Sequence, residues 1–408
     1  MMFATWKKFS ALAPGVRTMI FIFWTYKLAM TLMGIFLSVF VYLKTESLVA
    51  LALFLLIGNT ALMIGFVGGG LVMSHYGLST QRNFLWAFLL FLCASIILVL
   101  LPHTYPSLLI FGALMSLGNG VFWLTIHTLE LSQTKNTGRD FYSSMVELGG
   151  QVTIVLSPLL ATLSFLLSEQ WLHVETYTLL FFILPILYLC ALPLVRKAPS
   201  FVPPKTTLAE VFSFFRHKGN TARIYYAAGA SLYALHGIII PIVAIFALKT
   251  VVNLGLVEIV LGIFSLLIIT LLANYRHEGN RVTLMGISTC GFLVAFFLLL
   301  FYDSHVFAYL AYSFMAVALR PIQRVSEHMI DLQTVDSLHG GTSFFPALLY
   351  RDLFLWIFRA LVGTFMIVLS LLAVSETTQL HVGIILMMGL IFTSWQMARR
   401  LMRKSLAV

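Results

Sequence analysis

The chain has 408 residues, of which 60% are hydrophobic and only 10% are charged. A typical soluble domain contains about 45–50% apolar and about 25% charged residues. The formal net charge of +10 could indicate a nucleic-acid partner, but a soluble surface of this size needs far more charged residues. The composition therefore excludes a soluble enzyme, a nucleic-acid-binding protein and a disordered chain. It predicts a polytopic protein embedded in a lipid bilayer.

Apolar segments long enough to cross a bilayer recur along the whole chain. A membrane-spanning helix needs about 20 predominantly apolar residues, and twelve segments meet this requirement. The predicted spans are 18–43, 47–73, 83–101, 107–129, 142–167, 177–195, 223–248, 251–274, 282–302, 306–330, 345–373 and 380–398. The first segment is too long for the apolar region of a signal peptide and lacks a cleavage site. We therefore expect it to be retained as a helix.

The basic residues indicate on which side of the membrane each loop lies. Five of the 25 Lys and Arg residues fall inside predicted spans, when Arg223, the first residue of the seventh span, is counted with the preceding loop. Lys44 and Lys249 lie in loops on one side, whereas the other 18 lie in loops on the side of the chain termini. Loops rich in Lys and Arg stay in the cytoplasm. The sequence therefore predicts an integral protein of the cell (inner or plasma) membrane with both termini cytoplasmic.

The segment between the sixth and seventh spans divides the chain into two halves. It is basic, and its prolines, from Pro199 to Pro204, are followed by apolar residues at helical spacing. That pattern predicts a linker with a short amphipathic helix at the membrane surface. We expect an N-terminal six-helix bundle at 1–195, a cytoplasmic linker at 196–222 and a C-terminal six-helix bundle at 223–408.

Matching motifs occur in the same order in the two halves. His127-Thr-Leu-Glu-Leu ends the fourth span, and His328-Met-Ile-Asp-Leu ends the tenth. Leu43-Lys-Thr closes the first span, as Leu248-Lys-Thr closes the seventh. These matches favour an internal duplication. The predicted fold is all-α, with twelve transmembrane helices in two pseudo-symmetric six-helix halves.

The loop after the second span carries the most specific motif. Its sequence, Gly70-Leu-Val-Met-Ser-His-Tyr-Gly77, is similar to the G-x-x-x-D-R-x-G signature of the major facilitator superfamily. Ser74 and His75 stand where the signature has its acidic residue and arginine. With the layout of six plus six helices, the chain resembles this superfamily over nearly its whole length. The resemblance implies a transporter with its binding site between the halves. Residues 350–359 also resemble a bacterial branch sometimes called YqgE-like.

Four cations inside the predicted spans are candidate substrate-binding residues. An ionisable group at the centre of a span costs at least about 2.5–3.5 kcal/mol, so each one is a functional candidate. Because deep cations outnumber equally deep acids, they favour an anionic substrate, and arginine can bind carboxylate or phosphate through two parallel hydrogen bonds. The alternative for each is a structural ion pair. The candidates are Lys27, Arg320, Arg324 and Arg359.

Six further residues are candidates for proton coupling or gating. Glu147, His236 and Glu258 fall inside spans, where burial or a nearly neutral pKa can place their titration in a useful range. The residue types do not choose among these three. Glu327 and Asp331 near the end of the tenth span and Asp352 in the eleventh are expected gate residues. Ion pairing with Arg351 or a neighbouring arginine is the alternative for Asp352.

Other kinds of site are not expected. The chain has no G-x-x-x-x-G-K-[ST] loop, which excludes direct ATP drive by this chain. Its 11 histidines form no H-x-x-x-H or Cys/His cluster, so we expect neither a metal nor a cofactor. The three cysteines lie in apolar runs and predict no disulfide framework.

The sequence therefore predicts a secondary active transporter, not an enzyme. We expect a monomer that moves a small anionic or amphipathic solute by alternating access, as a symporter or antiporter coupled to H⁺, with no nucleic-acid partner. Two alternatives stay open: a multidrug or siderophore-type exporter, and a non-transporting membrane sensor or assembly factor in a transporter fold. A polytopic membrane enzyme is less consistent, because its catalytic residues would cluster at one membrane face.

Overall fold

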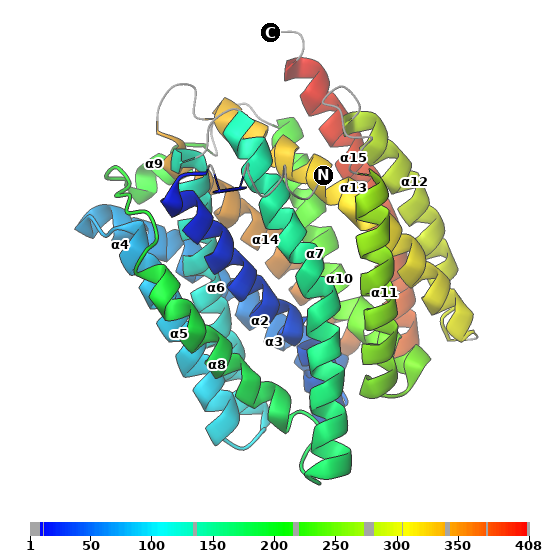
Figure 1. Ribbon diagram of the computed structural model, residues 1–408. Coiled ribbons are helices and arrows are strands. Elements are labelled where there is room, and N and C mark those ends of the chain that lie inside the picture. Colours follow the sequence, from blue (N-terminus) through cyan, green and yellow to red (C-terminus); the bar gives the residue numbers. More distant parts are fainter. Residues whose placement is uncertain are drawn as a thin grey trace. The chain divides into compact units, whose positions relative to one another are not determined.

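The computed structural model describes residues 9–10, 12–133, 137–214, 220–272, 281–303, 305–338, 343–372 and 374–405. The described residues form helices joined by short loops, with no strand among them (Figure 1). Twelve helical stretches in this part of the chain are long and apolar enough to cross a membrane. The predicted all-α fold with twelve membrane-spanning helices is therefore confirmed.

The helices follow the predicted order of spans. The first six spans comprise α2 (Pro14–Thr45), α3 (Leu48–Met63) with a π-helical turn (Ile64–Gly68) and α4 (Gly69–Tyr76), α5 (Thr80–Leu100), α6 (Tyr105–Gln133), α7 (Thr137–Leu166) with a second π-helical turn (Leu167–Trp171), and α8 (Thr178–Val195). After the short α9 (Leu208–Ser213), the last six are α10 (Asn220–Leu248), α11 (Val251–Leu272), α12 (Arg281–Leu299), α13 (Val306–Leu338), α14 (Phe344–Leu371) and α15 (Glu376–Ser405).

One span differs from the prediction in a way that matters for the site. Helix α13 continues to Leu338, eight residues beyond the predicted end of the tenth span at residue 330. The sequence becomes more polar towards this end while the chain stays helical. Glu327 and Asp331, expected at the end of the tenth span, therefore lie within a continuous helix rather than at its end.

Helix contacts divide the chain into two compact units. Unit 1 consists of Met1–Met33 and Ala61–Leu208, and unit 2 of Gly34–Thr60 and Ala209–Val408. The first part of the linker, up to Leu208, thus belongs to unit 1 and the rest to unit 2, and a part of α2 and α3 also belongs to unit 2. The assignment of 1–195 and 223–408 to two six-helix bundles stays a prediction.

Aromatic side chains fill the core of unit 1. Helix α5 packs against α6 and α8, and the Phe91 and Tyr188 rings stack with their centroids 5.0 Å apart. Helix α2 adds Tyr26, whose ring stacks on Phe122 of α6 at 3.7 Å. Its hydroxyl donates to Asn119 Oδ1 at 2.6 Å. Burial of these large rings stabilises the unit and orients the α2 residues on either side of Tyr26, which include Lys27.

The linker is hydrogen-bonded to the motif loop of unit 1. Ser74 donates its hydroxyl to Pro204 O at 2.8 Å and accepts the N–H of Thr206. Thr80, the first residue of α5, donates its hydroxyl to Pro199 O at 2.9 Å and accepts the N–H of Phe201 at 2.9 Å. The serine that replaces the acidic residue of the resembled signature therefore binds linker backbone. The linker ends in α9, which matches the predicted short helix.

Helix α10 lies at the centre of unit 2. It packs against α15, α14, α11 and α13, while α12 packs against α13 and α15. Its second half, from Ile238 to Ile245, consists entirely of buried residues. A helix that is apolar on every side must be covered on every side. Helix α10 is therefore a fixed framework for the polar residues in its first half.

Two glycines form a close helix crossing in unit 1. A Cβ placed on Gly120 of α6 would meet Leu62 O and would lie 2.6 Å from Phe66 N. A Cβ on Gly65 would meet Leu117 O in the same way. Small residues let two backbones approach this closely. Gly65 and Gly120 therefore serve helix packing at this crossing.

We predict that Gly120→Ala destabilises the protein, because the added methyl meets backbone atoms that cannot move aside alone. Overpacking of this kind costs about 1–3 kcal/mol. Thermal unfolding of the purified protein in detergent measures the effect. Gly150→Ala is the matched control, since its Cβ meets nothing within 4 Å among the described residues. Equal melting temperatures for the two variants would contradict the prediction.

Candidate functional site

Two arginines reach the same face of α10 inside unit 2. Tyr233 and His236 lie three residues apart on this helix and therefore share a face. Nη2 of Arg320, from α13, lies 2.6 Å from His236 Nε2. The guanidinium carbon of Arg359, from α14, lies 5.3 Å from the centre of the Tyr233 ring. Two of the four predicted substrate-binding residues are thus brought to adjacent turns of one helix.

The contact with Arg320 determines the protonation state of His236. A guanidinium can only donate hydrogen bonds, so His236 Nε2 must accept. The imidazole is therefore neutral in this structure, with its proton on Nδ1. The Tyr312 hydroxyl lies 3.3 Å from the same Nε2. A proton bound at Nε2 would break the bond to Arg320 and place a second positive charge beside it.

Glu258 adds the negative charge of this cluster. It is half-buried on α11 and interacts electrostatically with Arg320. Tyr309 and Tyr312, one turn apart on α13, also interact with Glu258 and Arg320. The structure therefore brings together three residues that the sequence analysis named separately, namely His236, Glu258 and Arg320. We call these three residues with Tyr312 the α10–α13 cluster.

Arg359 has unused hydrogen-bonding capacity. Its Nε is buried and has no hydrogen-bond partner among the described residues. The Tyr233 ring beside it is 67% exposed. A cation–π contact stabilises a guanidinium but satisfies none of its N–H donors. A charged group within a span faces the bundle interior or a water-filled cavity, so these donors can bind an anion from the interior.

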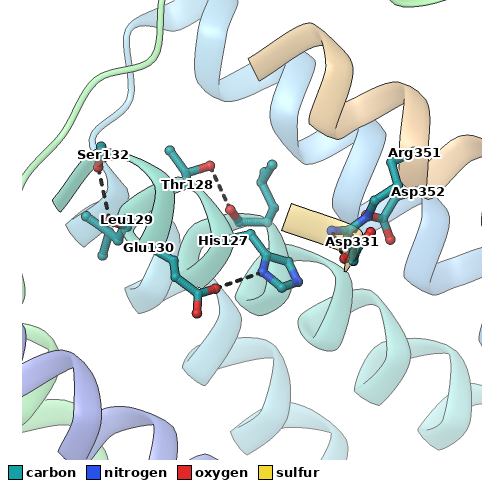
Figure 2. Close-up of polar contacts among 9 residues, drawn as sticks. His127, Thr128, Leu129, Glu130, Ser132, Asp331, Arg351 and Asp352 are labelled. Carbon is teal, nitrogen blue, oxygen red and sulfur yellow. Dashed lines mark hydrogen bonds and ion pairs between the residues drawn. The ribbon is translucent and has the colours of Figure 1, made fainter. Parts of the chain in front are cut away.

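A second cluster pairs a buried arginine with two carboxylates. Arg351 of α14 donates to Asp331 Oδ2 at 2.8 Å and to Asp352 Oδ2 at 3.0 Å, as Figure 2 shows. Arg351 is 5% exposed and Asp352 is 6% exposed. For Asp352, this is the ion pair that the sequence analysis left open as the alternative to gating. Arg351 was not among the predicted site residues, although its position beside Asp352 was a signal for it.

The other predicted residues are distributed over both units. Glu327 accepts a hydrogen bond from Gln323 Nε2 at 2.6 Å, and Arg324 interacts electrostatically with His236. Lys27 is half-buried on α2 of unit 1. The side chain of Glu147 lies outside the described part of the chain.

Unit 1 contains a polar pair that the sequence analysis did not name as a site. His127 Nδ1 lies 3.2 Å from Glu130 Oε2, and both side chains are buried (Figure 2). The Trp123 ring stacks on the His127 ring with centroids 5.2 Å apart. The signal was the duplicated motif, since Glu130 occupies in the first half the place of Asp331 in the second. Among the described residues no group of three His, Cys, Asp or Glu side chains could hold a metal ion.

Comparison with solved structures shows where this fold occurs. The chain is similar to the nucleoside transporter NupG, with a TM-score of 0.64 at 9% identity over 94% of this chain and 98% of that one. It is similar to the peptide transporter POT, with a TM-score of 0.65 at 14% identity over 95% of each chain. The third is the human organic anion transporter MFSD10 (TETRAN), with a TM-score of 0.64 at 13% identity over 94% of this chain and 99% of that one.

These identities are low, so the likeness shows the fold alone. The chain shares its fold with these three transporters. Membership of the major facilitator superfamily, which the sequence resemblance implied, stays a prediction. No family model matches the chain, and no curated protein is similar enough in sequence to count as a relative. The narrower resemblance to the YqgE-like branch stays a prediction.

We predict that Arg351→Met strongly destabilises the protein, because it leaves two carboxylates without their shared cation. Removing one partner from a buried ion pair costs about 3–5 kcal/mol. Combining Arg351→Met with Asp331→Asn and Asp352→Asn should restore much of the melting temperature, since the stranded charges are then gone. If the triple variant were no more stable than Arg351→Met, the carboxylates would have another role.

Proposed function

We propose that the chain is a secondary active transporter that moves a small organic anion, amphipathic or fully polar, by alternating access coupled to H⁺. The fold supports transport as the class of activity. The α10–α13 cluster and Arg359 support the substrate class and the coupling. We propose further that the protein is a monomer of the cell inner or plasma membrane. Both of its termini are cytoplasmic in this proposal, because the basic residues gather in the loops on their side.

The observation that carries the proposal is the pairing of two half-buried arginines with neutral groups. His236 holds Arg320, and the Tyr233 ring holds Arg359. A carboxylate or phosphate offers each guanidinium a charge-assisted bond, which is roughly twice as strong as a bond between neutral groups. An anionic substrate therefore gains free energy by replacing these partners. Arg324 and Lys27 are expected to contribute further positive potential.

The α10–α13 cluster also supplies a physical route for proton coupling. While Glu258 is ionised, it neutralises Arg320 and competes with a substrate anion. A proton on Glu258 removes that competition, so that the anion and the proton bind together. This order predicts symport of H⁺ with the anion. His236 remains neutral while it accepts a hydrogen bond from Arg320, and its protonation would release Arg320 instead.

We predict that an organic anion raises the melting temperature of the purified protein, because a ligand that binds the native state stabilises it by mass action. The probes are benzoate, succinate, inorganic phosphate and, as a cationic comparison, tetraphenylphosphonium. Arg320→Gln and Arg359→Gln should each weaken anion binding about 10- to 100-fold, since a bond to a charged group is worth about 1.5–3 kcal/mol. Arg400→Gln, which removes an exposed arginine near the end of α15, is the matched control.

The outcomes distinguish the proposal from its alternatives. Stabilisation by anions that persists in both the Arg320 and the Arg359 variant would overturn the assignment of the site. Stabilisation by tetraphenylphosphonium alone would favour the multidrug exporter. If no probe shifted the melting temperature, a membrane sensor or assembly factor would become the better interpretation, and a search for partner proteins would follow.

We predict that Glu258→Gln separates binding from coupling, because glutamine resembles the protonated glutamate. In proteoliposomes with an imposed pH gradient, the variant should exchange the stabilising anion across the membrane but should no longer accumulate it. Asp303→Asn, which changes an exposed acid outside the spans, should leave accumulation intact. Accumulation driven by the pH gradient in Glu258→Gln would show that another group carries the proton.

A further inference from the structure

The boundary between the two units runs through α2 and α3. Unit 1 contains the chain up to Met33 and again from Ala61, whereas the intervening segment Gly34–Thr60 belongs to unit 2. This segment, which we call the α2–α3 hairpin, comprises the end of α2, the loop after Thr45 and most of α3. By the loop-charge prediction, its turn lies on the outer side of the membrane. The hairpin is thus continuous with unit 1 in sequence but packs with unit 2.

An interruption of regular α-helix lies at the first end of the hairpin and another lies close to its second end. Gly34, its first residue, has φ −10° and ψ −111°, which is non-helical backbone inside α2. Four residues beyond its end at Thr60, the chain enters the π-helical turn Ile64–Gly68. Breaks in the α-helical hydrogen-bond pattern are where helices bend, and π-helical turns occur frequently at functional sites. The hairpin therefore has a candidate hinge at each end.

One carboxylate fastens the hairpin to the rest of unit 2. Glu376, the first residue of α15, accepts the Tyr42 hydroxyl on Oε2 at 2.8 Å. It accepts the backbone N–H of Leu48 on Oε1 at 3.4 Å. Leu48 is the first residue of α3, whose initial N–H groups have no partner within their own helix and attract negative charge. Glu376 thus binds both helices of the hairpin at once, the end of α2 and the start of α3.

Three further contacts of the hairpin join neutral groups. The Tyr42 ring meets Phe246 of α10 edge to face, with centroids 5.8 Å apart. Trp356 of α14 donates to the Thr60 hydroxyl at 3.2 Å. Gly363, seven residues further along α14, lets Leu56 approach so that an added Cβ would lie 3.3 Å away. These contacts between neutral groups can slide, whereas the charge-assisted bonds to Glu376 require one position.

We propose that Glu376 is a gate residue that latches the α2–α3 hairpin onto the rest of unit 2, and that Gly34 and the π-helical turn are the hinges at which the hairpin bends when the latch opens. The proposal rests on the proposed transport function in one respect, since the latch must open when the units rearrange during the cycle. The sequence analysis did not name Glu376 as a site residue.

The test measures whether the hairpin stays attached, independently of any substrate. Ala52, which is 1% exposed on α3, lies four residues after Leu48 and on the same helix face. A single cysteine at position 52, in a chain whose exposed Cys93, Cys190 and Cys290 are replaced by alanine, reports exposure of this face. The readout is the rate of its reaction with a maleimide in the purified full chain.

We predict that Tyr42→Phe increases the labelling rate at position 52 by roughly tenfold, because it removes one hydrogen bond to a charged group. Glu376→Ala should increase the rate at least as much, because it removes the bonds to both Tyr42 and Leu48. Tyr42→Phe added to Glu376→Ala should have no further effect, since the bond to Tyr42 is already absent. Glu46→Gln, which changes an exposed acid of the same loop, is the matched control and should label at the parental rate.

Two outcomes would overturn the latch. One is an unchanged labelling rate in both Tyr42→Phe and Glu376→Ala, and the other is an equal increase in Glu46→Gln. Tyr42→Phe keeps the ring and its packing, so it remains informative if Glu376→Ala does not fold. A failure of every anion to stabilise the protein would instead contradict the proposed function and would leave the labelling test valid. The two ideas can therefore fail separately.

Discussion

The burial of arginine inside membrane spans is the constraint on which the arrangement of unit 2 depends. A guanidinium carries five N–H donors and a permanent charge. Lipid tails offer it neither hydrogen-bond acceptors nor a counter-charge. Helix α10 meets this need for Arg320 and Arg359 with an imidazole and an aromatic ring on adjacent turns. Because α10 is itself packed by four helices, the two cations are held in place without being neutralised by direct ion pairs in the described structure.

The contrast with Arg351 explains why only some charges are assigned to the substrate. Arg351 lies between two aspartates at hydrogen-bond distance and is almost fully buried. A ligand would have to displace two carboxylates to reach it, which makes a structural role the more economical explanation. Arg320 and Arg359 have partners that an anion can replace with a gain in free energy. The chemical nature of the partner, rather than the depth of the arginine, therefore separates the two kinds of site.

The connections of the chain show a similar division between fixed and releasable contacts. The linker is fastened to unit 1 by neutral hydrogen bonds from Ser74 and Thr80 to backbone atoms. The α2–α3 hairpin has several contacts between neutral groups in unit 2, but its charge-assisted bonds both end on the carboxylate of Glu376. Hydrogen bonds that start from different side chains must break separately, whereas bonds that share one side chain can open together.

The twelve spans could be predicted from the sequence because the bilayer acts on each segment locally. Every span must be about 20 apolar residues long and must satisfy its own backbone as a helix. The list of candidate charges followed from the same rule, since Lys27 and Arg359 are costly wherever their spans pack. The tertiary structure decided which of these charges meet. His236, Glu258 and Arg320 come from three helices, and no spacing within the sequence encodes their distance. Partners such as Asp331 for Arg351, or Glu376 for Tyr42, depend on how helices far apart in the chain pack together.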